Sequence, residues 1–188
     1  MKDLIFVGIQ GSGKGTQAKV VAERHGFQIF ETGGALRKMA QEDSELGRKV
    51  KEITERGDLV PNEIVMEIVE NFLQNIDPST PAIFDGIPRS EEQRVSLEAL
   101  LESKGREFAV IQLEVSEDVV MARLLKRAEI EGRADDNPES IKKRIANFYA
   151  HTQPLLDVWK TDGRLHTVNG AKAVEDVDLE IEEKIANC

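Results

Sequence analysis

Cysteine is almost missing from this sequence, because Cys188, the last residue, is the only one. An internal disulfide therefore cannot form, and a zinc site built from cysteines is not expected. Aromatic residues make up only 5%, so few flat side chains are present on which exposed bases could stack. No apolar run approaches the roughly 18 residues that predict a membrane-spanning helix. These scarcities argue against a fold held by disulfides, a zinc–cysteine centre and a membrane span.

Positive charge is also in short supply, since 25 lysines and arginines face 35 aspartates and glutamates. A net charge of -10 repels nucleic-acid backbones, so no nucleic-acid partner is expected. Any phosphate site must therefore gather its positive charge locally. The N-terminal stretch MKDLIFVGIQGSG is short, carries Asp3 and is broken by glycines, so it predicts neither a signal peptide nor a membrane anchor. We expect a cytoplasmic protein with no membrane partner.

Strand and helix patterns alternate along the 188 residues, which suffice for one globular unit. Apolar runs predict buried strands at 3–8, 81–86 and 106–115, and a shorter strand is predicted at 164–170. Helical patterns lie at 14–25, 62–75, 91–103, 117–130, 139–160 and over a final helix whose core face is Val174, Val177, Ile181 and Ile185. This alternation predicts an α/β fold, a mostly parallel sheet with helices on both faces, which binds ligands beyond the carboxyl ends of its strands. Residues 31–60 and 126–136 fit the sheet poorly and are interpreted as appendages.

Residues 8–17, GIQGSGKGTQ, come close to the phosphate-binding form G-x-x-x-x-G-K-[ST]. A predicted strand precedes the stretch and a predicted helix follows it, which is the context that this form requires. The glycines allow backbone N–H groups to converge on phosphate oxygens, and Lys14 can reach the outer phosphates. The general form next has a serine or threonine that contacts magnesium, but here Gly15 follows Lys14 and Thr16 comes one place late. The loop alone predicts a nucleoside triphosphate site and leaves open how the metal is held.

Polar residues at two further turns extend this prediction. Asp85 ends a predicted strand, where a carboxylate can hold magnesium or its water shell; a turn cap is the alternative. Arg89 offers a planar fork to a phosphate, and Gln93 offers a paired donor and acceptor to a base edge. In ETGGALR, Thr32 supplies a hydroxyl and Arg37 a second fork. The turn GDLVP at 57–61 adds backbone groups.

A third group of residues is basic and brackets the charged stretch 126–136. It comprises Arg123, Arg127, Arg133 and Arg144, with Asp135 and Asp136 placed to hold the arginines. A solvated surface is the simpler interpretation of any one of these arginines. An arginine-bearing flap, however, is what phosphoryl transfer requires, because the transferred group carries charge on several oxygens and water must be excluded.

Together these stretches resemble the adenylate kinases, within the nucleoside monophosphate kinases, over essentially the full length. The matching stretches are GSGKGTQ, TGGALR, GDLVPNEIV, FDGIPRSEEQ, RLLKR, GRADDNPESIKKR and VNG. The resemblance implies a P-loop parallel sheet flanked by helices, acting as a monomer on ATP and AMP to give two ADP with Mg²⁺. It also implies a core (1–30, 61–125 and 137–188), an AMP-binding segment (31–60) and a short lid (126–136). Long-lid relatives insert about thirty residues there, often with zinc-binding cysteines, so no zinc is expected.

The resemblance also implies a role for each candidate residue. For ATP, the residues are Gly11, Ser12, Gly13, Lys14, Gly15 and Thr16 around the phosphates, Arg123 near the adenine, Arg127 on the phosphates, and Gly170 to Lys172 beside the base. For AMP, they are Thr32, Arg37, Asp58, Leu59, Val60, Gly86, Ile87, Pro88, Arg89 and Gln93. Arg133 and Arg144 clamp the phosphates at the point of transfer. Catalysis is expected from Lys14, Arg89, Arg127, Arg133 and Arg144, with Asp85 holding magnesium through water and no covalent nucleophile.

Four residues depart from the usual family pattern. Gln10 stands where proline is usual, which is expected to leave the loop less stiff while keeping its phosphate contacts. Glu31 replaces a serine, and Gly34 replaces an aspartate that would brace the moving helix. Ile87 replaces an aromatic residue and is expected to thin the apolar wall near the monophosphate.

Two other functions compete with AMP phosphorylation. A UMP/CMP kinase of the same fold usually has alanine in place of Thr32 and an asparagine-rich segment after the arginine that matches Arg89, so Thr32 and SEEQ favour AMP. A non-catalytic nucleotide-binding switch would carry a guanine-reading N-K-x-D segment, and VNGAK is not one. Such a binder would also not need the arginine clamp.

Overall fold

A computed structural model describes residues 1–131 and 137–186 of the chain. Within them, five strands form one sheet in the order β2-β3-β1-β4-β5, and every neighbouring pair is parallel. The strands are β1 (Asp3–Val7), β2 (Gln28–Glu31), β3 (Ala82–Asp85), β4 (Phe108–Glu114) and β5 (Leu165–Asn169). The predicted α/β class and parallel sheet are therefore confirmed.

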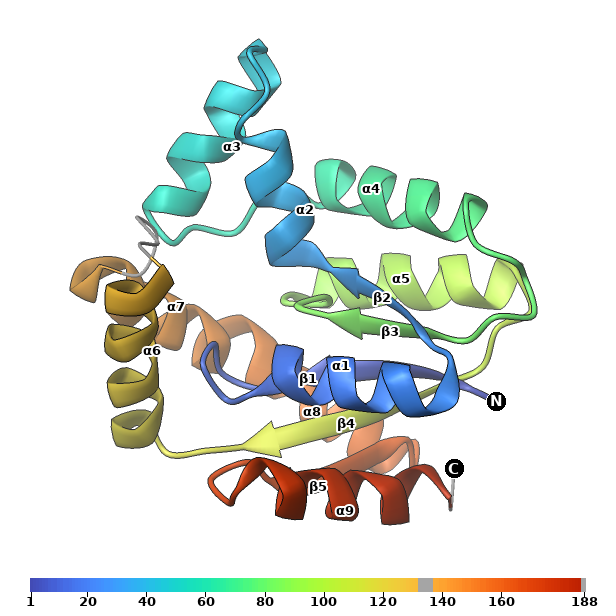
Figure 1. The fold of residues 1–188 in the computed structure, drawn as a ribbon. Coiled ribbons are helices and arrows are strands. Elements are labelled where there is room, and N and C mark those ends of the chain that lie inside the picture. The colour runs from blue at the N-terminus through green and yellow to red at the C-terminus, as the bar shows by residue number, and fades with distance from the viewer. Residues whose placement is uncertain (132–136, 187–188) are drawn as a thin grey trace.

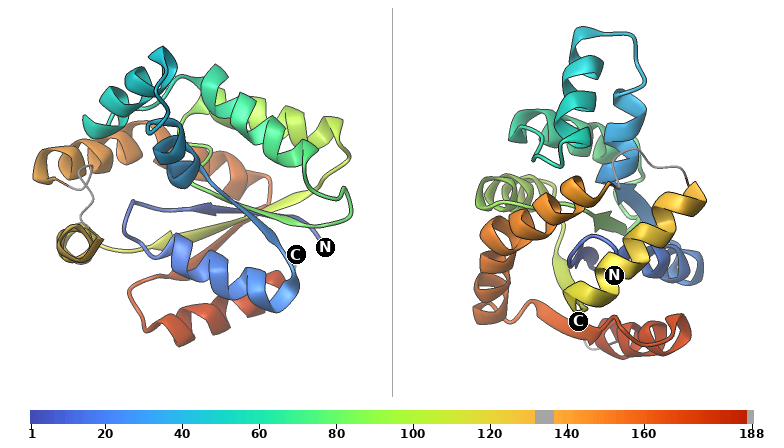
Figure 2. Two further views of the ribbon diagram at one scale, coloured as in Figure 1. Left: turned by 45° about the horizontal axis from the view of Figure 1, so that its top comes forward. Right: turned by 90° about the vertical axis from the view of Figure 1, so that its left-hand side faces the viewer.

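Helices cover both faces of this sheet (Figure 1). They are α1 (Lys14–His25), α2 (Thr32–Met39), α3 (Glu45–Glu55), α4 (Asn62–Gln74), α5 (Glu91–Ser103), α6 (Glu117–Glu131), α7 (Pro138–Asn147), η1 (Phe148–Thr152), α8 (Gln153–Thr161) and α9 (Val174–Ile185). Figure 2 (left) shows α4 and α5 on one side of the sheet and α1 and α9 on the other. The strand carboxyl ends point toward α6 and α7.

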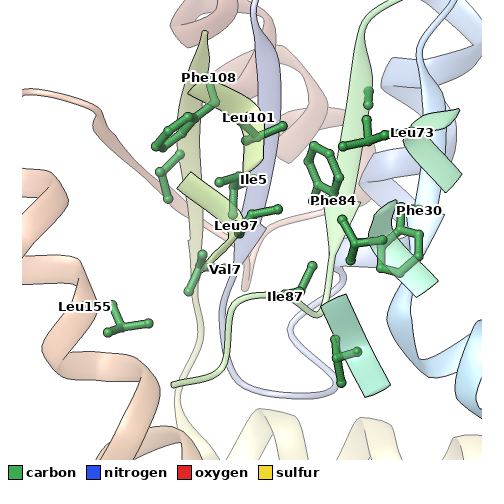
Figure 3. Packing of buried hydrophobic residues seen from close by; sticks show 14 of the residues in the cluster. Ile5, Val7, Phe30, Leu73, Phe84, Ile87, Leu97, Leu101, Phe108 and Leu155 are labelled. Atoms are coloured by element: carbon green, nitrogen blue, oxygen red, sulfur yellow. The ribbon is translucent and has the colours of Figure 1, made fainter. Parts of the chain in front are cut away.

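Alternate side chains of the central strands fill two cores, because successive residues of a strand point to opposite faces. In β1, Ile5 and Val7 pack with α4, α5 and α8, whereas Leu4 and Phe6 pack with α1 and α9. Figure 3 shows Phe84 among the residues of the first core. Burying one such side chain contributes about 1.5–3 kcal/mol. A third cluster joins α6 and α7 to the phosphate loop through Ile9.

The start of the sheet is fixed by a buried ion pair. Both oxygens of Asp3 accept hydrogen bonds from Arg106, at 2.7 Å each, and one of them also accepts from the backbone N–H of Ala82 at 2.8 Å. The pair therefore joins the beginning of β1 to the chain segments before β3 and β4, at the end of the sheet far from the strand carboxyl ends.

Two features differ from the sequence prediction. Strand β2 was not predicted, because it is a four-residue edge strand in which only Phe30 is buried, so it lacks a continuous apolar run. The helix predicted over 139–160 is divided into α7, η1 and α8. Pro154 lies in the first turn of α8, and its missing N–H interrupts the regular helical hydrogen bonds there.

Candidate active site

The stretch between β1 and α1 forms a compact turn before the helix. The N–H of Ser12 donates to the carbonyl of Ile9 at 3.0 Å, with Gly11 at a φ of +86°. This is the geometry of a type II turn, whose third residue needs a positive φ. Gly13 caps α1 in the left-handed region, at a φ of +104°. A Cβ on Gly11 would also lie 2.9 Å from the side chain of Leu124 in α6, so glycine is required there for two reasons.

Lys14, the first residue of α1, folds its side chain back over this turn. Its ammonium donates to the carbonyl oxygens of Gly8 at 2.8 Å and of Ile9 at 3.1 Å. Burial lowers the pKa of Lys14 from 10.5 to about 8, although the nearby Asp85 carboxylate acts in the opposite direction. The loop therefore holds a partly buried cation whose charge is poorly solvated and which a phosphate would stabilise.

Asp85 explains why a glycine follows Lys14. A Cβ built on Gly15 would lie 3.3 Å from Oδ2 of Asp85, so a serine or threonine at this position would crowd the carboxylate. Asp85 is buried at the end of β3, and that burial raises its pKa. Gly15 therefore leaves room for a carboxylate that faces the start of α1.

A cavity of about 770 Å³ opens in front of the loop. Most of the predicted ATP-side and transfer residues line it together: Gly11, Ser12, Gly13, Lys14, Gly15, Thr16, Asp85, Arg89, Arg123, Arg127, Arg144, Gly170 and Lys172. The predicted ATP side of the site is therefore one continuous space.

A second, smaller cavity of about 60 Å³ adjoins the first. It is lined by most of the predicted AMP residues: Thr32, Arg37, Asp58, Leu59, Val60, Gly86, Arg89 and Gln93. Thr32 is 3% exposed, and its Oγ1 is buried without a hydrogen-bond partner among the described residues. A buried hydroxyl without a partner is costly, so this one is placed to bond a ligand in the cavity.

The two cavities share a wall. The residues that line both are Gln10, Gly33, Arg37, Leu59, Gly86, Arg89 and Arg144. Three of these are arginines, so positive charge is concentrated at the boundary although the whole protein is acidic. A phosphate bound in either cavity would meet the same guanidinium groups.

Arg89 is held by its own turn. Its Nε donates to the carbonyl of Gly86 at 2.8 Å, and its backbone N–H donates to Oε1 of Gln93 at the same distance. Thr152 of η1 donates its hydroxyl to the Arg89 carbonyl at 2.9 Å. The turn is thus braced from α5 and from η1. Because the Gln93 oxygen already accepts this bond, its amide nitrogen is the better placed group for a base.

Arg123 of α6 joins two parts of the large cavity. It donates to the carbonyl of Ser12 at 3.3 Å and to that of Gly170 at 3.0 Å. Lys172, in the same turn as Gly170, is ion-paired to Glu180, and this contact raises the pKa of Lys172. The turn after β5 is therefore fixed against the phosphate loop.

Ile87 and Arg133 stand apart from the other predicted site residues. Ile87 is 1% exposed and packs in the first core, as Figure 3 shows, so its side chain lines neither cavity and the expected apolar wall is not formed by it. The turn between β3 and α5 directs this side chain toward the sheet. Arg133 lies outside the described residues.

Two contacts at the shared wall were not predicted from the sequence. Gln10 accepts a hydrogen bond from Arg144 at 2.8 Å, and Glu31 accepts one from Arg37 at 2.9 Å. Gln10 and Arg144 are 134 positions apart. No periodicity relates them, so only the fold reveals the pair. Glu31 and Arg37 lie six positions apart, which is not one of the three- or four-residue spacings that bring helix side chains together, so the sequence does not indicate this contact either.

The described residues lack a membrane-spanning helix and a cluster of metal ligands. In residues 1–131 and 137–186, no helix is both long and apolar enough to cross a bilayer. The same residues contain no group of three or more histidine, cysteine, aspartate or glutamate side chains that could hold a metal ion.

Comparison with known proteins places this site in a family context. A family model described as adenylate kinase matches residues 6–164. An adenylate kinase of Bacteroides thetaiotaomicron is 36% identical over 186 residues, covering 98% of this chain and 98% of the relative. One from Caulobacter sp. (strain K31) is 40% identical over 176 residues, 93% of each chain. One from Rhizobium meliloti is 40% identical over 190 residues, 97% of this chain and 99% of the relative.

Proposed function

The chain belongs to the adenylate kinase family, and from that premise we propose how its two cavities carry out the reaction of the family. The protein is an enzyme that transfers a phosphoryl group from ATP to AMP, giving two molecules of ADP. ATP, AMP and ADP are its substrates, and the family works with magnesium. The residue roles below are our proposals.

The observation that carries the proposal is the wall of arginines between the two cavities. ATP binds in the large cavity, and AMP binds where the small cavity opens into the large one, so the two sets of phosphates meet at Arg89 and Arg144. An AMP phosphate oxygen attacks the γ-phosphorus of ATP, and the bond from that phosphorus to the β–γ bridging oxygen breaks. The displaced ADP takes the electron pair. The protein forms no covalent bond and acts by positioning, charge stabilisation and exclusion of water.

On the ATP side, the backbone N–H groups of residues 11–16 surround the phosphates, aided by the partial positive charge at the start of α1. Lys14 exchanges its two loop carbonyls for phosphate oxygens and follows the transferring group. Arg127 contacts the phosphates, and Arg123 lies beside the adenine. Residues 170–172 present backbone to the base.

On the AMP side, Thr32 supplies its buried hydroxyl and Arg37 supplies a fork for the phosphate. Glu31 pairs with the Arg37 guanidinium until AMP binds. Residues 58–60 and Gly86 contribute backbone, and Gln93 donates its amide to the base. Arg89 spans both substrates, and Arg133 joins Arg144 in the clamp.

Magnesium enters with ATP, and Asp85 is the residue proposed to hold it through water. Gly15 supports this role, because the absence of a side chain leaves room beside the carboxylate at the start of α1. When bound, the metal would supply positive charge that offsets the charge of the phosphates. No zinc is required in this proposal.

We propose that three parts of the chain have separate roles. Residues 1–30, 61–125 and 137–188 form the core, 31–60 the AMP-binding segment and 126–136 a short lid. Figure 1 supports the second part, since α2 and α3 project away from the sheet. We further propose that the enzyme is a monomer and works in the cytoplasm. Thiols stay reduced there, and a sequence with one cysteine has no internal disulfide to keep oxidised.

Arg89→Ala tests the proposed transfer point. Removing a fork that meets both substrates should lower kcat/KM for AMP on the order of 10²-fold or more. The matched control is Arg48→Ala, which removes an arginine paired with Asp43 on the exposed surface of α3 and should leave the rate unchanged. Initial rates of ADP formation measure both variants. A fall in kcat/KM of less than threefold in Arg89→Ala would show that this guanidinium is only a solvated surface group.

A further inference from the structure

Arg144 contacts two other elements of the site. It lies on α7, yet one end of its guanidinium donates to Oε1 of Gln10 in the phosphate loop, at 2.8 Å. The other end donates to the carbonyl of Thr54 in α3, at 3.0 Å. The group is thereby held from two sides at the boundary between the cavities, where the phosphoryl group passes.

Gln10 reaches Arg144 because of its place in the turn. The bond from the Ser12 N–H to the Ile9 carbonyl encloses Gln10 and Gly11, and the positive φ of Gly11 makes the turn type II. Gln10 is the second residue of that turn, a position at which proline is favoured because it fixes φ. Proline would keep the turn but has no side-chain oxygen, so the acceptor for Arg144 exists only because glutamine stands there.

The chemistry of an amide suits this contact. A neutral oxygen orients a guanidinium without cancelling its positive charge, which stays available to phosphates. A carboxylate in the same place would bind Arg144 more strongly and would also repel those phosphates. Part of the Gln10 side chain lines both cavities, so it stands beside the reacting groups without having to contact them.

We propose that Gln10 is a positioning residue for the phosphoryl transfer, whose amide oxygen holds the Arg144 guanidinium at the boundary of the two cavities. This inference rests on the proposed role of Arg144 in clamping the phosphates. Gln10 would then be a residue of the phosphate loop that acts on the reaction through the Arg144 side chain and not through its own backbone.

A double-mutant cycle on Gln10 and Arg144 tests the proposal. Gln10→Met keeps the length of the side chain and removes its acceptor; kcat should fall about tenfold, as expected for losing one hydrogen bond to a charged group. KM for ATP and for AMP should each change less than about threefold, because the contact matters most when charge develops. In an Arg144→Ala background, Gln10→Met should change kcat less than about twofold.

The cycle separates the two claims. If Arg144→Ala itself leaves kcat within about threefold, the proposed clamp is wrong and the role of Gln10 falls with it. If Arg144→Ala is slow but Gln10→Met has no effect, the clamp stands and only the role of Gln10 is overturned. Equal losses from Gln10→Met in both backgrounds would also overturn it, since Gln10 would then act without Arg144.

Gln10→Pro shows whether kcat depends on the amide oxygen of Gln10 or on the stiffness of the loop. This variant suits the turn and removes the acceptor, so it should lose as much kcat as Gln10→Met, with a melting temperature within a few degrees of the parent protein. Retention of the full kcat by Gln10→Pro, beside a loss in Gln10→Met, would show that loop conformation matters and the amide oxygen does not. That result would contradict the proposal.

Discussion

Gly34 and Glu31 are two departures from the usual family pattern that the side-chain contacts relate to each other. A Cβ added to Gly34 would lie 3.4 Å from the carboxyl carbon of Glu31. An aspartate at position 34 would therefore bring a second negative charge against Glu31, which accepts a hydrogen bond from Arg37. Glycine at 34 removes this conflict, so the two departures belong together.

Lys14 gives the site a testable pH dependence. Bound phosphates stabilise the ammonium form, so the pKa of Lys14 in the complex lies above its value of about 8 in the free protein. Binding then takes up a proton near and above pH 8 and is favoured at lower pH. From the protonated fraction, affinity for ATP should fall about tenfold between roughly pH 7 and pH 9. Titration calorimetry at several pH values measures this change.

Lys14→Met is the control for that measurement, because ATP also titrates in this range. The variant should bind ATP more weakly at neutral pH and should lose the part of the pH dependence that Lys14 contributes. An identical slope in the variant and the parent protein would show that Lys14 keeps its charge throughout.

Thr32 offers a second prediction at the scale of one side chain. Its Oγ1 is buried and has no hydrogen-bond partner among the described residues, so Thr32→Val removes no internal bond and should leave the melting temperature equal or slightly higher. The KM for AMP should rise about tenfold, the effect of one lost hydrogen bond of about 1.4 kcal/mol.

Thr161→Val is the comparison variant, since that hydroxyl bonds the Asp157 carbonyl on an exposed helix and should not affect the KM for AMP. A clear loss of stability in Thr32→Val with an unchanged KM would assign the Thr32 hydroxyl to the fold instead of the substrate.

At the scale of elements, the end of α3 is fixed to α7 by three contacts. Thr54 accepts from Arg144, and the carbonyl of Gly57 accepts from the side chain of Asn147 at 3.0 Å. Asp58 pairs with Lys143 at 2.5 Å, and that hydrogen bond lowers the pKa of Asp58. The segment that we propose to bind AMP is therefore joined at its end to the helix that carries Arg144.

Gly57→Ala tests whether this contact positions the AMP site. Gly57 has a φ of +73°, and a new Cβ would lie 2.9 Å from both oxygens of Ser140 in α7. The segment must then move away from α7, so the KM for AMP should rise severalfold and kcat should fall. Steady-state rates measure both.

Gly105→Ala supplies a matched control. Gly105 has a similar φ of +64°, but nothing lies within 4 Å of its added Cβ. Both variants bear the backbone cost of alanine at positive φ, on the order of 1 kcal/mol, and only Gly57→Ala adds a clash. Equal values of kcat and of KM for AMP in Gly57→Ala and Gly105→Ala would show that the α3–α7 contact does not position the residues proposed to bind AMP.

At the scale of the whole molecule, much of the architecture follows from the sequence. β1, β3 and β4 are apolar runs bounded by turn residues, so a single pattern predicts each of them, whereas β5 has only Val168 buried and gives a weaker pattern. The edge strand β2 could not be predicted, because its pairing with β3 supplies the stability that its sequence does not indicate. Propensity is a weaker signal than tertiary pairing in such short elements.

The candidate site divides in the same way. The phosphate loop, Asp85 and Arg89 are recognisable because the loop follows the end of β1, Asp85 ends β3, and Arg89 lies in the turn after β3. The bond between Gln10 and Arg144 is not, because it depends on where α7 lies relative to the loop. The buried state of Ile87 also depends on the fold, since a turn can direct its side chain inward or outward. Local chemistry is readable from the sequence, whereas contacts between distant elements require the structure.

The central claim is that the two cavities bring ATP and AMP together at one wall of arginines. The most direct measurement is the rate of phosphoryl transfer from ATP with Mg²⁺ to each of AMP, dAMP, CMP, UMP and GMP. The account predicts that AMP gives the highest kcat/KM, with CMP and UMP well below it. Faster turnover of CMP or UMP than of AMP would contradict the assignment of the smaller cavity to AMP.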